Sequence, residues 1–168
     1  MNEIDQKTDA GTPGFTLALA LVDALPVLFF GISCIVLGML FQSVLFVIGA
    51  VLMFFGGLGK VLWKLFLAVS KKDIAFLDRQ FRYSMCAGFV LIVISLIAGW
   101  RRISFSAIGA AVLSMPSLLF FVIAVAGLVA MGVLASKLDS SVAKNNWIEQ
   151  CVNSVAQLSL LLALLFLL

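Results

Sequence analysis

Residues 24–59 read ALPVLFFGISCIVLGMLFQSVLFVIGAVLMFFGGLG, a run of 36 residues without a charged side chain. A helix needs about 20 mainly apolar residues to cross a bilayer core of roughly 30 Å. The run is therefore too long for one membrane-spanning helix and has the length of two. Gln42 and Ser43 form its polar break, which predicts a tight turn between spans at residues 24–41 and 44–62.

The composition of the whole chain has the same character. Of its 168 residues, 64% are hydrophobic and 11% are charged, and the mean hydropathy is +1.23, whereas roughly a quarter of the residues in soluble domains are charged. We therefore predict an all-α integral membrane protein of about five spans in one bundle, which occupies residues 15–168. A short disordered tail is expected at residues 1–14, and the remaining spans at residues 83–100, 116–135 and 148–168.

The absence of histidine excludes several classes of function. Haem ligation by histidine, zinc sites that contain histidine, and Ser-His or Cys-His catalysis all need this residue. Cys34, Cys86 and Cys151 stand singly in apolar runs and form no C-x-x-C pair, so disulfide chemistry is not predicted. We expect no cofactor, no bound metal and no enzymatic activity.

Two acidic residues give the one hint of chemistry near lipid headgroups. Asp73 and Asp78 are five residues apart, which places them about 140° apart around a helix and does not suit a shared metal. An enzyme that uses Asp78 and Arg79 on lipid headgroups is therefore the least favoured hypothesis.

Residues 60–82, KVLWKLFLAVSKKDIAFLDRQFR, hold six of the eleven positive charges of the chain. If they form one helix at about 100° per residue, Lys60, Lys64, Lys71, Asp78 and Arg82 share one narrow face. This pattern is typical of a helix on an anionic lipid surface, and it predicts a basic amphipathic connection on the cytosolic side between the second and third spans. The residues expected to contact anionic lipid headgroups or a partner are Lys60, Lys64, Lys71, Lys72, Arg79 and Arg82.

The distribution of charge also predicts an orientation. Five spans place nine of the eleven Lys and Arg residues on the side of this basic stretch and leave Arg101 and Arg102 on the other. Lys and Arg concentrate on the cytosolic side of membrane proteins. We expect the amino terminus in the cytosol and the carboxyl terminus on the far side, with a bacterial inner membrane as the favoured location. No basic tail predicts nucleic-acid binding.

Four glycines are spaced regularly in the first two spans. Gly31 and Gly38 are seven residues apart in the first, and Gly49 and Gly56 are seven apart in the second. In an antiparallel hairpin folded near residue 43, each glycine faces a glycine of the other helix. Small residues allow helix backbones to approach closely in a membrane, so the pattern predicts close packing of these two spans.

Asp23 and Pro26 have two interpretations. If the first span begins at residue 24, Asp23 is its N-cap at the water interface, Pro26 lies in the first turn, and residues 15–22 lie along the interface. Alternatively, Asp23 is an ionisable residue inside the span, and Pro26 interrupts the helix so that carbonyl groups become available to an ion or proton. The N-cap interpretation is favoured.

Polar residues also mark the last span. Gln150, Asn153, Ser154 and Gln157 recur at helical spacing and form one face, which predicts contact with another helix or, alternatively, the polar lining of a small pathway. Residues 103–114 precede Pro116 and form an interfacial segment, a re-entrant segment or part of the fourth span.

These patterns favour a non-enzymatic membrane protein that acts through helix association. It would self-associate as an oligomer or serve as a small subunit of a larger complex with other membrane subunits, and its surroundings would be the lipid bilayer. The alternative is a small transporter or channel. Its path would be lined by Asp23, Pro26, Gln150, Asn153 and Gln157.

Overall fold

The computed structural model describes residues 16–70, 74–102, 104–138 and 142–168. These residues form helices joined by short turns, and they include no strand. Five of the helices are long and apolar enough to cross a membrane, which confirms the predicted helical class and the predicted number of long helices. The elements are α1 (Leu17–Phe41), α2 (Val44–Ser70), α3 (Ala75–Gly99), η2 (Trp100–Arg102), α4 (Phe105–Val112), α5 (Ser117–Lys137) and α6 (Ala143–Leu165).

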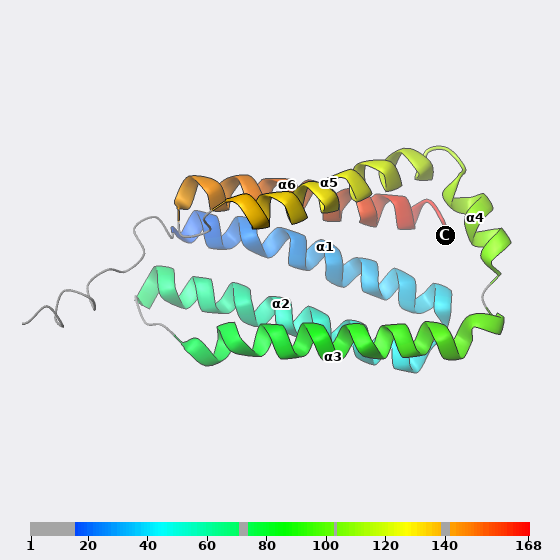
Figure 1. Cartoon of the computed structure of the whole chain (residues 1–168), viewed down its shortest axis with the longest axis horizontal. Helices are drawn as coiled ribbons and strands as arrows, with labels where there is room; N and C mark the ends of the chain where they lie inside the picture. Colours follow the sequence, from blue (N-terminus) through cyan, green and yellow to red (C-terminus); the bar gives the residue numbers. More distant parts are fainter. Residues whose placement is uncertain (1–15, 71–73, 103, 139–141) are drawn as a thin grey trace, which may run out of the picture.

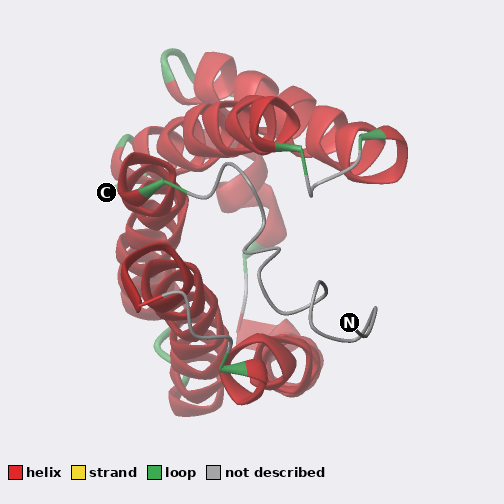
Figure 2. Cartoon of the chain, turned by 90° about the vertical axis from the view of Figure 1, so that its left-hand side faces the viewer, coloured by secondary structure: helices red, strands yellow, loops and turns green. Residues whose placement is uncertain are grey.

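The long helices pack in an order that differs from their order in the chain. α2 packs against α3, α1 packs against both α2 and α6, and α6 packs against α5. The spatial order is therefore α3, α2, α1, α6, α5, and the helices form an open arc whose edges are α3 and α5 (Figures 1 and 2). α1 and α6 run in the same direction, whereas α2 runs antiparallel to α1 and to α3 (Figure 1).

Three helices begin earlier than predicted and two end later. α1 begins at Leu17 and not at residue 24, α3 at Ala75 and not at residue 83, and α6 at Ala143 and not at residue 148. α2 continues to Ser70 and α5 to Lys137. The prediction ended each helix where charged residues begin, but a charged side chain can remain within a helix when it pairs or reaches an interface. The predicted tail at residues 1–14 lies outside the described residues.

The basic stretch is not one continuous helix, so this prediction is wrong. α2 ends at Ser70, and α3 begins at Ala75 and packs back along α2. The ammonium nitrogen of Lys60 lies 4.6 Å from the centre of the Phe81 ring across this pair. The two arms of a hairpin each show helical periodicity, and the sequence pattern therefore resembled that of a single helix. Lys71 and Lys72 lie outside the described residues.

The predicted pairing of glycines is also wrong. A Cβ atom added at Gly49 would lie 2.7 Å from the carbonyl oxygen of Gly88 in α3, and one added at Gly56 would lie 2.9 Å from Cβ of Ser84. Gly31 and Gly38 of α1 instead meet side chains of α2, Phe54 and Val47 respectively. The pairing assumed that glycines at matching depth face each other, but depth does not fix the rotation of each helix about its axis.

The short helix α4 crosses from the end of α3 to the start of α5 at one end of the bundle (Figure 1). A turn at residues 113–116 separates it from α5, so residues 105–112 are not part of the fourth long helix.

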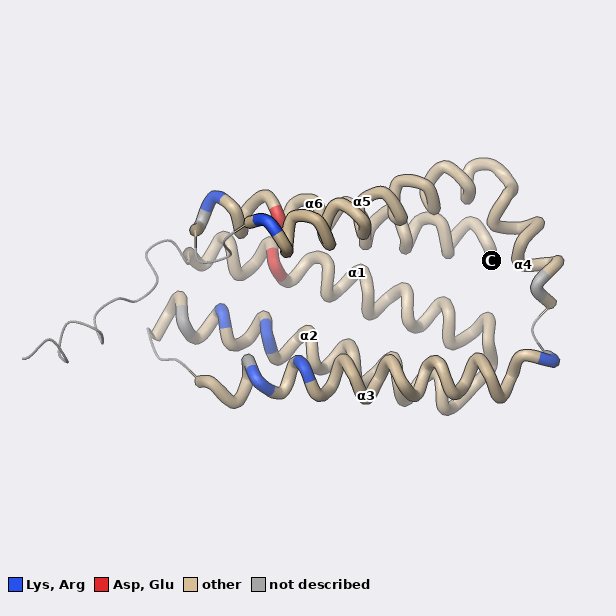
Figure 3. The backbone as a smooth tube through the Cα atoms, in the orientation of Figure 1, with Lys and Arg blue, Asp and Glu red and all other residues tan. Residues whose placement is uncertain are grey.

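Positive charge gathers at the opposite end of the bundle (Figure 3). Arg101, which follows α3, lies at the α4 end. The described Lys and Arg residues of the basic end are Lys60, Lys64, Arg79, Arg82, Lys137 and Lys144.

Candidate polar site between α1, α2 and α6

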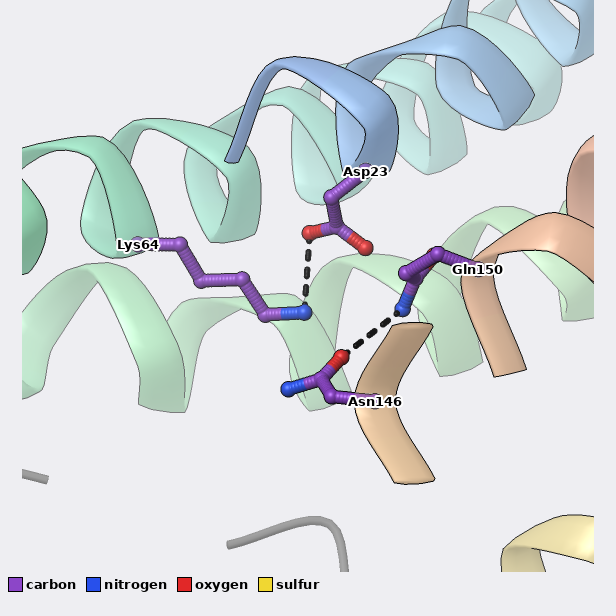
Figure 4. A network of polar contacts seen from close by, with 4 residues as sticks. All are labelled: Asp23, Lys64, Asn146 and Gln150. Carbon is purple, nitrogen blue, oxygen red and sulfur yellow. Dashed lines mark hydrogen bonds and ion pairs between the residues drawn. The ribbon is translucent and has the colours of Figure 1, made fainter. Parts of the chain in front are cut away.

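A buried ion pair joins α1 to α2 near the basic end of the bundle. The ammonium nitrogen of Lys64 lies 2.9 Å from Oδ2 of Asp23 (Figure 4). The side chains are 6% and 9% exposed for Lys64 and Asp23. Charges removed from water to this extent persist when they are paired, so each side chain holds the other in place.

The start of α1 explains why Asp23 is available for this pair. Thr16 is the N-cap of α1, and its hydroxyl oxygen accepts a hydrogen bond from the backbone N–H of Leu19 at 3.2 Å. The favoured prediction that Asp23 is the N-cap is therefore wrong, as is the placement of Pro26 in the first turn, because Pro26 lies inside α1. Proline has no N–H, so the carbonyl of Val22 lacks its usual partner one turn along the helix.

α6 brings amide side chains to the same place. Gln150 donates a hydrogen bond from Nε2 to Oδ1 of Asn146 at 3.5 Å, and both residues are buried. Figure 4 shows this amide pair beside the ion pair, with Gln150 next to Asp23. The site therefore combines one positive, one negative and two neutral polar side chains from three helices.

Several buried polar atoms of α6 have no hydrogen-bond partner among the described residues. They include Oε1 of Glu149, of Gln150 and of Gln157, together with the hydroxyl of Ser154. The three Oε1 atoms are acceptors. An unsatisfied buried polar group destabilises a protein by about 1–3 kcal/mol, so this side of α6 carries a surplus of acceptors that hydrogen-bond donors would satisfy.

A pocket of about 300 Å³ lies about one helical turn further along α1 and α6 than this cluster, because Pro26 and Asn153 line it and follow Asp23 and Gln150 in the chain. Residues of α3 and α6 line it together, although these helices are separated in the arc by α2 and α1. The pocket therefore lies on the concave side. Its lining residues are Pro26, Val27, Phe30, Met53, Gly57, Phe81, Met85, Asn153 and Gln157.

The five residues predicted to line a path lie in one region of the structure. Asp23 and Gln150 belong to the polar cluster, and Pro26, Asn153 and Gln157 line the adjoining pocket. Their role in a path is not tested by this geometry and stays a prediction.

Sequence reasoning missed Lys64, which it had assigned to a lipid-facing stripe. A signal was present, because Asp23 lies 18 residues before the end of α1 and Lys64 lies 20 residues after the start of α2, at nearly the same distance from the turn between them. An antiparallel helical hairpin places such residues at the same depth. Asn146 and Glu149 were missed because they precede or begin the predicted last span.

In the part of the chain that the structure describes, no three His, Cys, Asp or Glu side chains are grouped so as to hold a metal ion. Comparisons of the chain with models of protein families, with curated proteins and with solved structures gave no significant match.

Proposed function

We propose that the chain is an integral membrane protein that moves a small ion across the bilayer, with the proton as the simplest case. The observation that carries this proposal is the Asp23–Lys64 ion pair, which is buried between two apolar helices. Ionisable residues within membrane helices are energetically costly, and they are typical of ion pathways and proton relays.

Further polar groups occur at successive depths of the bundle, in α1, in the turn after it and in α3. Beyond the pocket with its two amides, the hydroxyl of Ser33 in α1 is buried and has no partner among the described residues. Near the α4 end, the hydroxyls of Ser43 and Ser95 lie 2.7 Å apart, and both line a second pocket of about 570 Å³. These groups support a path that continues beyond the ion pair when the helices shift.

A flux measurement tests the proposal. The purified chain is placed in liposomes that contain a pH-sensitive dye, and a potassium gradient with valinomycin sets a membrane potential. We expect proton entry faster than in protein-free liposomes. We expect the double variant Asp23→Asn/Lys64→Gln to lower this rate close to the protein-free value, because it removes both ionisable groups without leaving an unpaired charge.

Two further variants separate this role from a structural one. The exchange Asp23→Lys/Lys64→Asp keeps an ion pair and reverses its direction, so we expect it to preserve the fold without restoring flux. Lys137→Gln removes an exposed charge at the same end of the bundle and should leave the rate unchanged. Equal proton entry with the wild type, with the neutral double variant and without protein contradicts the proposal.

The same proposal places the basic end of the bundle in the cytosol, because Lys and Arg concentrate on that side. Labelling of a cysteine placed at Lys137 by a membrane-impermeant reagent, before and after cells are permeabilised, checks this orientation. The bacterial inner membrane is the location for which the charge pattern argues.

The open arc favours a second candidate function, in which the chain is an oligomer or a small subunit of a larger membrane complex. α3 and α5 each pack against a single long helix, so their remaining surfaces are available to another helix. We expect light scattering in mild detergent to show a dimer or a larger assembly. A chain that remains monomeric and copurifies with no other subunit contradicts this candidate.

A further inference from the structure

We infer that the pocket on the concave side is a binding site for a small uncharged molecule with an apolar body and one N–H or O–H donor. The inference goes beyond the proposed ion movement and does not depend on it. It rests on the size of the pocket, the chemistry of its wall and an acceptor atom on that wall that has no partner in the described part of the chain.

The wall is suited to an apolar body. Phe30, Phe81, Met53 and Met85 line the pocket from three helices. Aromatic rings give a large apolar contact surface, and methionine side chains adapt to the shape of a ligand. The absence of a side chain at Gly57 leaves space in the same wall. The volume of about 300 Å³ is at the lower end of the range for small-molecule sites, roughly 300–1,000 Å³.

The wall does not favour a charged ligand. None of the described residues that line the pocket is charged. Of the buried charged residues on the neighbouring turns, Asp23 and Lys64 neutralise each other at 2.9 Å, and Glu149 of α6 does not line the pocket. A charged group placed among these apolar side chains would lose its hydration without gaining a counter-charge.

The polar requirement comes from α6. Gln157 lines the pocket, and its Oε1 is buried without a hydrogen-bond partner among the described residues. Asn153 places a second amide in the same wall. A ligand that donates a hydrogen bond to Gln157 removes the penalty of an unsatisfied acceptor, whereas an isosteric ligand without a donor does not.

Indole and 1-methylindole form a matched pair of probes for this inference. Both have the same apolar bicyclic body, and 1-methylindole lacks the N–H donor. The full chain is placed in lipid nanodiscs, and binding is measured by equilibrium dialysis as the excess over nanodiscs without protein. We expect saturable binding of indole and about tenfold weaker binding of 1-methylindole, as for the loss of one buried hydrogen bond.

Variants of α6 assign the binding to this pocket. Gln157→Leu keeps the length of the side chain and removes the acceptor, so it should weaken indole binding about tenfold and abolish the preference over 1-methylindole. Val155→Leu alters an exposed position of the same helix and should change neither. Equal binding of the two probes to the wild type, or no saturable binding of either, overturns the inference. Because dialysis involves no flux, this result and the flux result are independent.

Discussion

A chain in which Lys64 is replaced by methionine should be less stable than the wild type by about 3–5 kcal/mol, the range measured when one partner of a buried ion pair is removed. Methionine is close to lysine in length, so the substitution leaves little empty space. It does leave the carboxylate of Asp23, 9% exposed, without its counter-charge. Unfolding by denaturant, followed by circular dichroism in detergent, measures this effect: the variant should unfold at a lower denaturant concentration than the wild type.

A double-mutant cycle separates the pair from its individual members. Asp23→Asn should also destabilise the chain, because it leaves a buried ammonium group. Asp23→Asn combined with Lys64→Met should recover much of the loss, since no unpaired charge remains. Lys137→Met, at an exposed position of α5, is the matched control and should change stability by less than about 0.5 kcal/mol. Additive losses from the two single variants would show that the ion pair does not couple α1 to α2.

The helical class of the fold could be predicted from the sequence, because it depends on hydropathy averaged over long stretches of residues. Runs of uncharged residues predicted five long helices, and the polar break at Gln42 and Ser43 predicted the turn between the first two. Gln42 adopts a positive φ of 46° there, a conformation that ends a helix. Helix ends were predicted less well, because hydropathy records which residues avoid water and not where the backbone stops being helical.

The candidate site was predictable in part. The polar face of α6 follows from helical spacing, and the structure places Gln150 beside Asp23. Lys64 could not be assigned to this site by composition, because lysine near the end of an apolar helix ordinarily reaches outward to the interface. The Lys64 side chain points inward because it lies at the same depth of the hairpin as the carboxylate of Asp23. Whether the two side chains meet depends on the rotation of α1 and α2 about their axes, which hydropathy does not specify.

The same rotation explains why Gly49, Gly56 and Gly59 of α2 face α3. A Cβ atom added at Gly88 would lie 2.5 Å from the carbonyl oxygen of Gly49 and 3.1 Å from the backbone nitrogen of Met53. These neighbours are backbone atoms, which cannot move aside as a side chain can. The two helices can therefore keep their present separation only while position 88 is glycine.

Gly88→Val should consequently separate α3 from α2 and destabilise the chain by about 3 kcal/mol or more, at or above the upper range for overpacked interiors. The loss falls on the edge of the arc, because among the described residues the long helix against which α3 mainly packs is α2. Gly132→Val in α5 is the matched control, since a Cβ there meets nothing within 4 Å. Denaturation curves for the two variants, together with the rate of proteolysis between α2 and α3, distinguish them. If both valines have the same small effect, the close approach of Gly49 and Gly88 does not hold α3 in place.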